Sequence, residues 1–182
     1  MKHARIPAAL MMAIAVALAQ TTPPPATDDL ATATRKLGVF VGKWKSEANS
    51  FETGYSHVGH LTSQINCRWS PQGNFLVCEQ QITDNEGQHT QLSIYSYNSK
   101  DGTYTISSMA GPGAQPWNGT VIISGNVWTY PGGFQAQGKK VEIRTTNDFS
   151  HSGVEQFKSE YSDDGRAHWT TMLQGTARKI AE

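Results

Sequence analysis

The sequence has two cysteines among its 182 residues, and neither acidic nor basic residues are in excess. The cysteines, Cys67 and Cys78, lie too far apart for the C-x-x-C motif that tunes a reactive thiol, so we expect no redox role. Fifteen Lys and Arg residues balance fifteen Asp and Glu residues, whereas a protein that binds nucleic acid needs a basic face. We therefore predict no nucleic-acid partner.

Long hydrophobic runs are also missing, and the one apolar stretch, Ala8–Leu18, lies near the N-terminus. It follows the basic residues Lys2 and Arg5 and leads into the small-x-small pattern Ala17-Leu18-Ala19. Such a stretch is too short to span a bilayer, and the whole pattern is typical of a secretory signal peptide. We predict that residues 1–19 are a signal peptide and that the protein is secreted or periplasmic, with no stable membrane span after cleavage. Retention of the segment as an uncleaved anchor stays open.

Helical periodicity is scarce as well. Gln20–Thr27 is rich in Thr and Pro, which predicts a flexible tether. Asp28 can cap a short helix over Asp29–Leu37, where apolar residues recur on one side at helical spacing. We assign residues 20–35 to a linker and the start of this helix, and residues 36–182 to a single domain.

Short runs rich in Val, Ile, Thr, Tyr and Trp fill most of the remaining chain. Turn signals such as S-P-Q-G, D-N-E-G and S-D-D-G-R separate these runs. The spacing predicts about ten strands in an all-β fold. No long helical segment intervenes, which excludes a parallel sheet, and the successive short hairpins favour an up-and-down antiparallel barrel with a short N-terminal capping helix.

The best-defined hairpin contains both cysteines. Along Tyr55–Trp69, apolar and polar residues alternate with a two-residue period, so that Cys67 shares a face with Trp69. In the partner strand, residues 74–82, Cys78 has the buried parity. Any register that puts both cysteines on one face makes them neighbours across the strands. We predict a Cys67–Cys78 disulfide, as expected in an exported protein, with two buried free thiols as the alternative.

The segments F-V-G-K-W and R-W-S-P-Q-G-N-F-L-V resemble the calycin group of lipocalin-like barrels. More narrowly, they resemble a bacterial exported lipocalin-like family with no assigned function. The resemblance implies that Trp44 packs across the barrel end beneath a basic residue of the last strand. Arg178 is the matching residue, and Lys179 competes for the role. We expect Gly42, Trp44 and Arg178 to close the barrel, with Gly42 allowing close approach of the backbones.

The inward parity also predicts the lining of a cavity. Ser63, Trp69 and Gln80 lie on the buried face of the first hairpin, and Trp169 and Thr171 share a face in the last strand. An apolar wall with a few polar groups is typical of a site for a small, largely apolar ligand. Alternatively, the polar groups satisfy one another in a filled core.

Metal, haem and hydrolytic chemistry have weaker support. His57 and His60 are three apart in a strand and face opposite sides, which disfavours a zinc site. The nitrobindins, a related barrel group, bind haem through one inward histidine. His57 is the one histidine that could act as an axial ligand here, but we favour an ordinary histidine at the barrel mouth or surface. Glu79, Glu142 and Glu155 alternate with apolar neighbours, as residues of a solvated face do, so we expect no catalytic carboxylate pair.

The sequence as a whole predicts an exported barrel that binds a small, largely apolar ligand without a cofactor. Two other functions stay open. One is a structural or protein-interaction module with a filled core, which the aromatic side chain of Trp117 in the loop at residues 111–117 would serve. The other is a haem-binding or enzymatic barrel that uses His57. The ligand and the oligomeric state are left open.

Overall fold

The computed structural model describes residues 30–111, 114–136 and 138–180. The predicted signal peptide, the tether and Asp28 lie outside these residues. The helix α1 (Leu30–Leu37) is followed by a single 3-10 turn, η1 (Gly38–Phe40). Ten strands then complete the chain: β1 (Gly42–Ser50), β2 (Gly59–Trp69), β3 (Leu76–Asp84), β4 (Gly87–Asn98), β5 (Thr103–Met109), β6 (Trp117–Ser124), β7 (Val127–Ala136), β8 (Lys139–His151), β9 (Val154–Ser162) and β10 (Thr170–Ile180).

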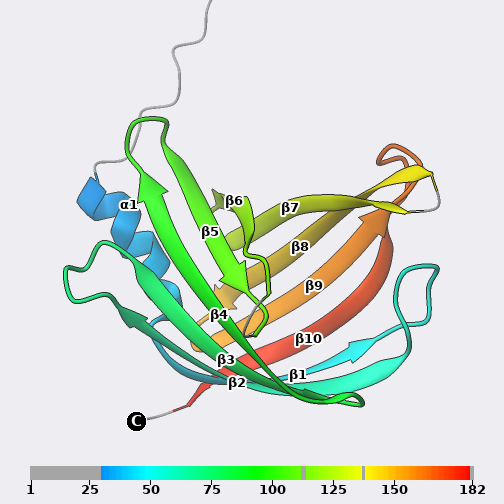
Figure 1. Cartoon of the computed structure of the whole chain (residues 1–182). Coiled ribbons are helices and arrows are strands. Elements are labelled where there is room, and N and C mark those ends of the chain that lie inside the picture. Colours follow the sequence, from blue (N-terminus) through cyan, green and yellow to red (C-terminus); the bar gives the residue numbers. More distant parts are fainter. Residues whose placement is uncertain (1–29, 112–113, 137, 181–182) are drawn as a thin grey trace, which may run out of the picture.

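The strands form a closed barrel in which each strand pairs antiparallel with its neighbours in sequence. The last strand returns to the first, and the β1–β10 ladder runs from Lys43 opposite Ile180 to Ser50 opposite Leu173. Figure 1 shows this meander of strongly twisted strands. The predicted up-and-down barrel of about ten strands is confirmed.

Buried and exposed side chains alternate along the strands of the barrel, and the buried ones differ in size. In β1 the side chains of Trp44, Ser46 and Ala48 are buried, while the residues between them are exposed. Because successive side chains of a strand point to opposite faces, this pattern fixes which face of each strand lies inside. In β4 the buried residues are Ser93 and Tyr95, which mark its inward face.

The helix α1 covers the end of the barrel at which β1 begins. It lies beside β4, near the turns that join β2 to β3 and β4 to β5 (Figure 1). Ala33 and Leu37 are fully buried, and the Tyr104 hydroxyl donates a hydrogen bond to the Ala33 carbonyl at 3.1 Å. The predicted capping helix is therefore confirmed. Among the described residues, no helix has the length and apolar character needed to cross a membrane.

The two cysteines face each other directly across β2 and β3, with their Cα atoms 4.0 Å apart, and they form a disulfide. This confirms the predicted pairing. Strand boundaries differ from the sequence-based expectation in two places. β2 begins at Gly59 rather than at Tyr55, and β8 continues to His151 although the segment N-D-F-S-H-S-G, residues 147–153, is typical of a turn. Phe149 explains the second difference, because its ring packs into the core and holds the chain extended.

Candidate functional site

The barrel encloses a cavity of about 400 Å³. About two thirds of the lining residues are apolar or aromatic, and the rest are polar: Ser46, Gln80, Gln91, Ser93, Thr145, Asn147 and Glu155. The cavity extends toward the end opposite α1, where Trp117 of β6 lines it and is 43% exposed. A core filled by side chains, the alternative raised by the sequence, does not fit this space.

An aromatic cluster forms the floor of the cavity at the α1 end. Phe40 of η1 lies 4.8 Å from Phe149, 5.0 Å from Trp128 and 5.4 Å from Tyr95, measured between ring centroids. Trp44 anchors this cluster, since its indole nitrogen donates a hydrogen bond to the Phe40 carbonyl at 2.8 Å. The tryptophan of the G-x-W segment therefore holds the floor in place and also lines the cavity.

The cation above Trp44 is Lys179, whose Nζ lies 5.8 Å from the ring centroid. The prediction that Arg178 fills this role is wrong, because Trp44 pairs with Lys179 in the β1–β10 register, and Arg178 pairs with the outward Lys45. Gly42 has a φ of +111°, and a Cβ atom there would approach Lys179 Cε to 2.8 Å. The glycine thus makes room for this lysine.

Glu155 of β9 lies inside the barrel, where it lines the cavity and is 5% exposed. The prediction that it belongs to a solvated face is wrong, because its parity is that of Phe157, which also lines the cavity. Burial raises the pKa of its carboxyl to about 7. Within the described chain, no hydrogen bond or ion pair to this carboxylate occurs. By contrast, Glu79 and Glu142 form ion pairs with basic residues on the outer face.

Two tyrosines accompany Glu155 in the cavity wall. Tyr95 comes from β4 and Tyr130 from β7, and both are buried. Burial raises the pKa of both phenols above the ordinary value of 10, and the nearby Glu155 charge adds to the effect. The Tyr130 hydroxyl is shielded from solvent and makes no hydrogen bond of good geometry among the described residues, although it interacts with the hydroxyl of Tyr95. The Glu155 carboxylate therefore has no partner within the described chain, and the Tyr130 hydroxyl has only the imperfect contact with Tyr95.

Two of the predicted lining residues, Ser63 and Gln80, do lie together in the cavity region. The Ser63 hydroxyl is 2.6 Å from the Ser46 hydroxyl and accepts a hydrogen bond from the Gln80 amide at 3.0 Å. Ser46 and Gln80 line the cavity directly. These hydrogen bonds give the side chains of Ser46, Ser63 and Gln80, one from each of β1, β2 and β3, partners in one another.

The other three predicted lining residues lie elsewhere. Trp69 is inward but packs against the core beside Gly38 of η1, at the α1 end. Trp169 and Thr171 are on the outer face, because an irregularity of register between Thr171 and Leu173 reverses the parity of β10. The Trp169 ring there covers the guanidinium of Arg144, 4.2 Å from its centroid. Arg144 is in turn paired with Glu160.

His57, the haem candidate, lies in the loop between β1 and β2 and not in a strand. Its side chain is 93% exposed and pairs with Glu52 at 3.3 Å. His57 is thus a surface histidine, as we favoured from the sequence, and the alternative of an axial haem ligand does not fit its position. Among the described residues, no three His, Cys, Asp or Glu side chains gather as a metal site.

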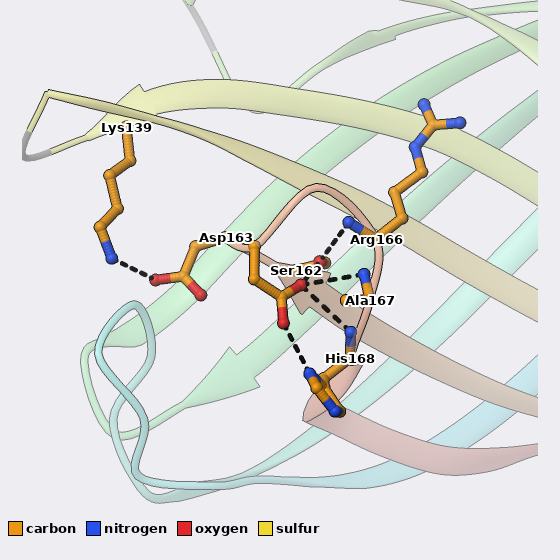
Figure 2. Close-up of polar contacts among 7 residues, drawn as sticks. Lys139, Ser162, Asp163, Arg166, Ala167 and His168 are labelled. Carbon is orange, nitrogen blue, oxygen red and sulfur yellow. Dashed lines mark hydrogen bonds and ion pairs between the residues drawn. The ribbon is translucent and has the colours of Figure 1, made fainter.

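The loop between β9 and β10 brings Ser162, Asp164 and His168 together, as Figure 2 shows in part. Both the Ser162 hydroxyl and the His168 ring bind the Asp164 carboxylate, at 2.7 Å each, rather than each other. The Asp164 carboxylate also accepts hydrogen bonds from the backbone N–H groups of Ala167 and His168. A serine nucleophile needs a direct hydrogen bond to its base, and Ser162 has none to His168. The three residues therefore form a clasp, a set of hydrogen bonds that holds the loop in shape. These hydrogen bonds hold the pKa of Asp164 well below its ordinary value.

Neither a family model nor a curated protein sequence matches the chain. Rv2717c from M. tuberculosis is similar in structure, with 14% identity and a TM-score of 0.56, and the match covers 84% of this chain and 100% of that one. The S-type phycobiliprotein lyase CPES from Guillardia theta is 10% identical with a TM-score of 0.52, over 85% of this chain and 99% of the other. Together with the closed meander of strands, these likenesses show that the chain has a calycin-like β-barrel fold.

Proposed function

We propose that this protein binds one small, largely apolar molecule inside the barrel. The observation that carries the proposal is the cavity of about 400 Å³ with its mostly aromatic and aliphatic wall. Small-molecule sites of proteins have about this size and composition, with a few polar groups that fix the orientation of the ligand. The two similar solved structures support the fold alone, so the argument rests on the cavity.

The rim at the end opposite α1 fits the entry of an apolar molecule. Four large apolar side chains are exposed there, Phe51, Val58, Trp117 and Phe134. Behind them, the Tyr55 ring lies 5.7 Å from the Phe134 ring and 4.7 Å from the Tyr161 ring. Of the four, Trp117 also lines the cavity, and exposed apolar groups beside the mouth of a cavity are typical of a ligand-binding surface.

We further propose that the protein acts outside the cytoplasm. The disulfide between Cys67 and Cys78 supports an oxidising compartment, and the N-terminal pattern of residues 1–19 supports export. Fractionation of cells that express the full chain tests this. We expect the protein in the exported fraction, with the mass of a chain whose first residue is Gln20. A cytoplasmic protein with the mass of the full chain would contradict the proposed export.

Binding can be tested with N-phenyl-1-naphthylamine, an uncharged probe whose fluorescence rises in an apolar site. Leu173 lines the cavity, and the next residue, Gln174, is exposed. We expect wild type and Gln174→Trp to bind one probe per chain and Leu173→Trp to bind the probe more weakly, because the larger indole takes up part of the cavity. Circular dichroism verifies that both variants fold. No binding by wild type, or equal binding by Leu173→Trp, would overturn the proposal.

A further inference from the structure

The Glu155 carboxylate is a buried polar group that the fold leaves unpaired. No hydrogen bond or ion pair satisfies it within the described chain, and it lines the cavity. It lies toward the α1 end, since its cross-strand partner in β10 is Ala177, which is itself opposite Ser46 of β1. A buried charge without a partner is destabilising, so such groups are rarely retained without one.

The groups around Glu155 supply no positive charge. Among the described residues that line the cavity, Glu155 is the sole charged side chain. Its titratable neighbours are Tyr95 and Tyr130, both neutral, and β10 contributes Ala177 on the facing position. Lys179, farther along β10, is exposed and its ammonium lies over the Trp44 ring. The described residues around the cavity therefore offer no cation to this carboxylate.

The same part of the cavity suits an ammonium group on an apolar body. A carboxylate is purely an acceptor, and an ammonium group is purely a donor with three N–H bonds. The Tyr130 hydroxyl, which makes no hydrogen bond of good geometry in the described chain, can accept a second of these hydrogen bonds. Phe40 and Trp44 add aromatic rings to this end of the cavity, and aromatic faces attract cations.

We propose that the ligand of the barrel is a small apolar molecule with a primary amine, and that Glu155 binds its ammonium group. This inference rests on the proposed function, since it names the chemical class of the cavity ligand. A carboxylic acid would be repelled by Glu155. A neutral alcohol would leave the charge without its counterion, so the amine is preferred over both.

A matched pair of probes tests this: 2-(1-naphthyl)ethylamine and 2-(1-naphthyl)ethanol, which differ in one group. Each is titrated at pH 8 against the protein loaded with N-phenyl-1-naphthylamine. A charge-assisted hydrogen bond corresponds to a preference of about tenfold or more, so we expect the amine to displace the probe at a concentration lower by at least that factor. Glu155→Gln should reduce the preference to within about twofold. Glu86→Gln, at an exposed turn residue, should keep it.

The pH dependence of wild type provides a second readout that needs no substitution. The pKa of Glu155 is about 7 in the unliganded cavity, so the preference for the amine should fall about tenfold from pH 8 to pH 6 as the carboxyl takes up its proton. The affinity for the alcohol should stay constant over this range, since the alcohol carries no charge.

The outcomes separate the two proposals. If wild type binds N-phenyl-1-naphthylamine but prefers the alcohol or shows no preference, the amine inference is overturned and cavity binding stands. The inference also fails if Glu155→Gln folds and keeps the preference for the amine. If none of the three probes binds, the proposed function itself is overturned.

Discussion

Trp44 and Lys179 face each other across the ladder that closes the barrel, with the lysine Nζ 5.8 Å from the centre of the indole ring. One residue belongs to the first strand and the other to the last. The pair therefore joins the two ends of the sheet, while the Trp44 indole nitrogen also holds Phe40 in the floor of the cavity. Arg178, the next residue back along β10, is exposed and takes no part in this contact.

Replacing Lys179 by Met keeps the length of the side chain and removes its charge. We expect Lys179→Met to lower the free energy of unfolding by about 0.5–1 kcal/mol, the usual contribution of an exposed cation–π contact. Arg178→Met is the matched control and should be neutral. Urea denaturation measures both, and an equal or larger effect of Arg178→Met would contradict the assignment.

The disulfide links residues that are 11 apart in sequence, and chain entropy gives a closed loop of this length about 3 kcal/mol of stability. Cys67→Ala combined with Cys78→Ala should therefore lower the free energy of unfolding by about this amount. Guanidinium denaturation measures it. Wild type unfolded in the presence of a reductant is the control and should show a similar loss. A loss well under 1 kcal/mol in both would contradict the prediction.

Glu155 should make the unliganded protein less stable at neutral than at acidic pH. The pKa of its carboxyl is about 7 in the fold against an ordinary 4.5, so the protonated form favours folding. The contribution of protonated Glu155 to the free energy of unfolding is fully present below pH 4.5 and is lost as the pH rises through 7. The whole change is about 3 kcal/mol. Glu155→Gln removes this dependence.

Urea denaturation of both proteins at several values of pH between 4.5 and 8 measures the effect. The stability advantage of Glu155→Gln over wild type should widen with pH and become constant above pH 7. Glu86→Gln serves as the exposed control and should follow wild type throughout. Parallel curves for wild type and Glu155→Gln would show that Glu155 is not desolvated.

Asp164 should act in the opposite direction. Hydrogen bonds from Ser162 and His168 lower the pKa of its carboxyl, so its stabilising effect is present above the ordinary value of 3.8 and is lost as the pH falls below it. Asp164→Asn should lower the melting temperature at pH 6. The difference from wild type should shrink toward pH 2. A difference that does not change with pH would contradict the carboxylate clasp.

Gly175 lies where β10 packs tightly against β1 and β9. A Cβ atom at this position would be 2.5 Å from both Ala48 Cβ and Phe157 Cζ, and it would also overlap the Glu47 carbonyl oxygen. Gly175→Ala should therefore cost about 1–3 kcal/mol, as overpacking of a core does. Gly54, with no atom within 4 Å of such a Cβ, provides the neutral control Gly54→Ala.

The fold could be predicted from the sequence because the two-residue alternation of apolar and polar residues in a strand is a local pattern. The alternation around Cys67 placed the disulfide, and the succession of short hairpins placed the strands in order. Closure of the barrel came from the resemblance carried by the G-x-W segment, and the structure confirms it. Local patterns of this kind survive into the structure because one face of each strand is buried.

The site was harder to predict because single residues decide it. One irregularity between Thr171 and Leu173 reversed the expected face of Trp169 and Thr171, and no local signal marks it. The sequence predicts Glu155 on the outer face because it alternates with apolar neighbours. Its parity with Phe157 and Tyr161 was the signal that could have placed it inside.

The β1–β10 ladder has a consequence for how the chain folds. Each other ladder joins strands that are adjacent in sequence, whereas this one brings Lys43 to Ile180. Forming a loop of that length costs about 4 kcal/mol of chain entropy, while a hairpin needs far less. The hairpins should therefore form first, and the β1–β10 pairing should form last. Until then β1 and β10 are open edges that a second molecule can extend, so refolding yield should fall as protein concentration rises.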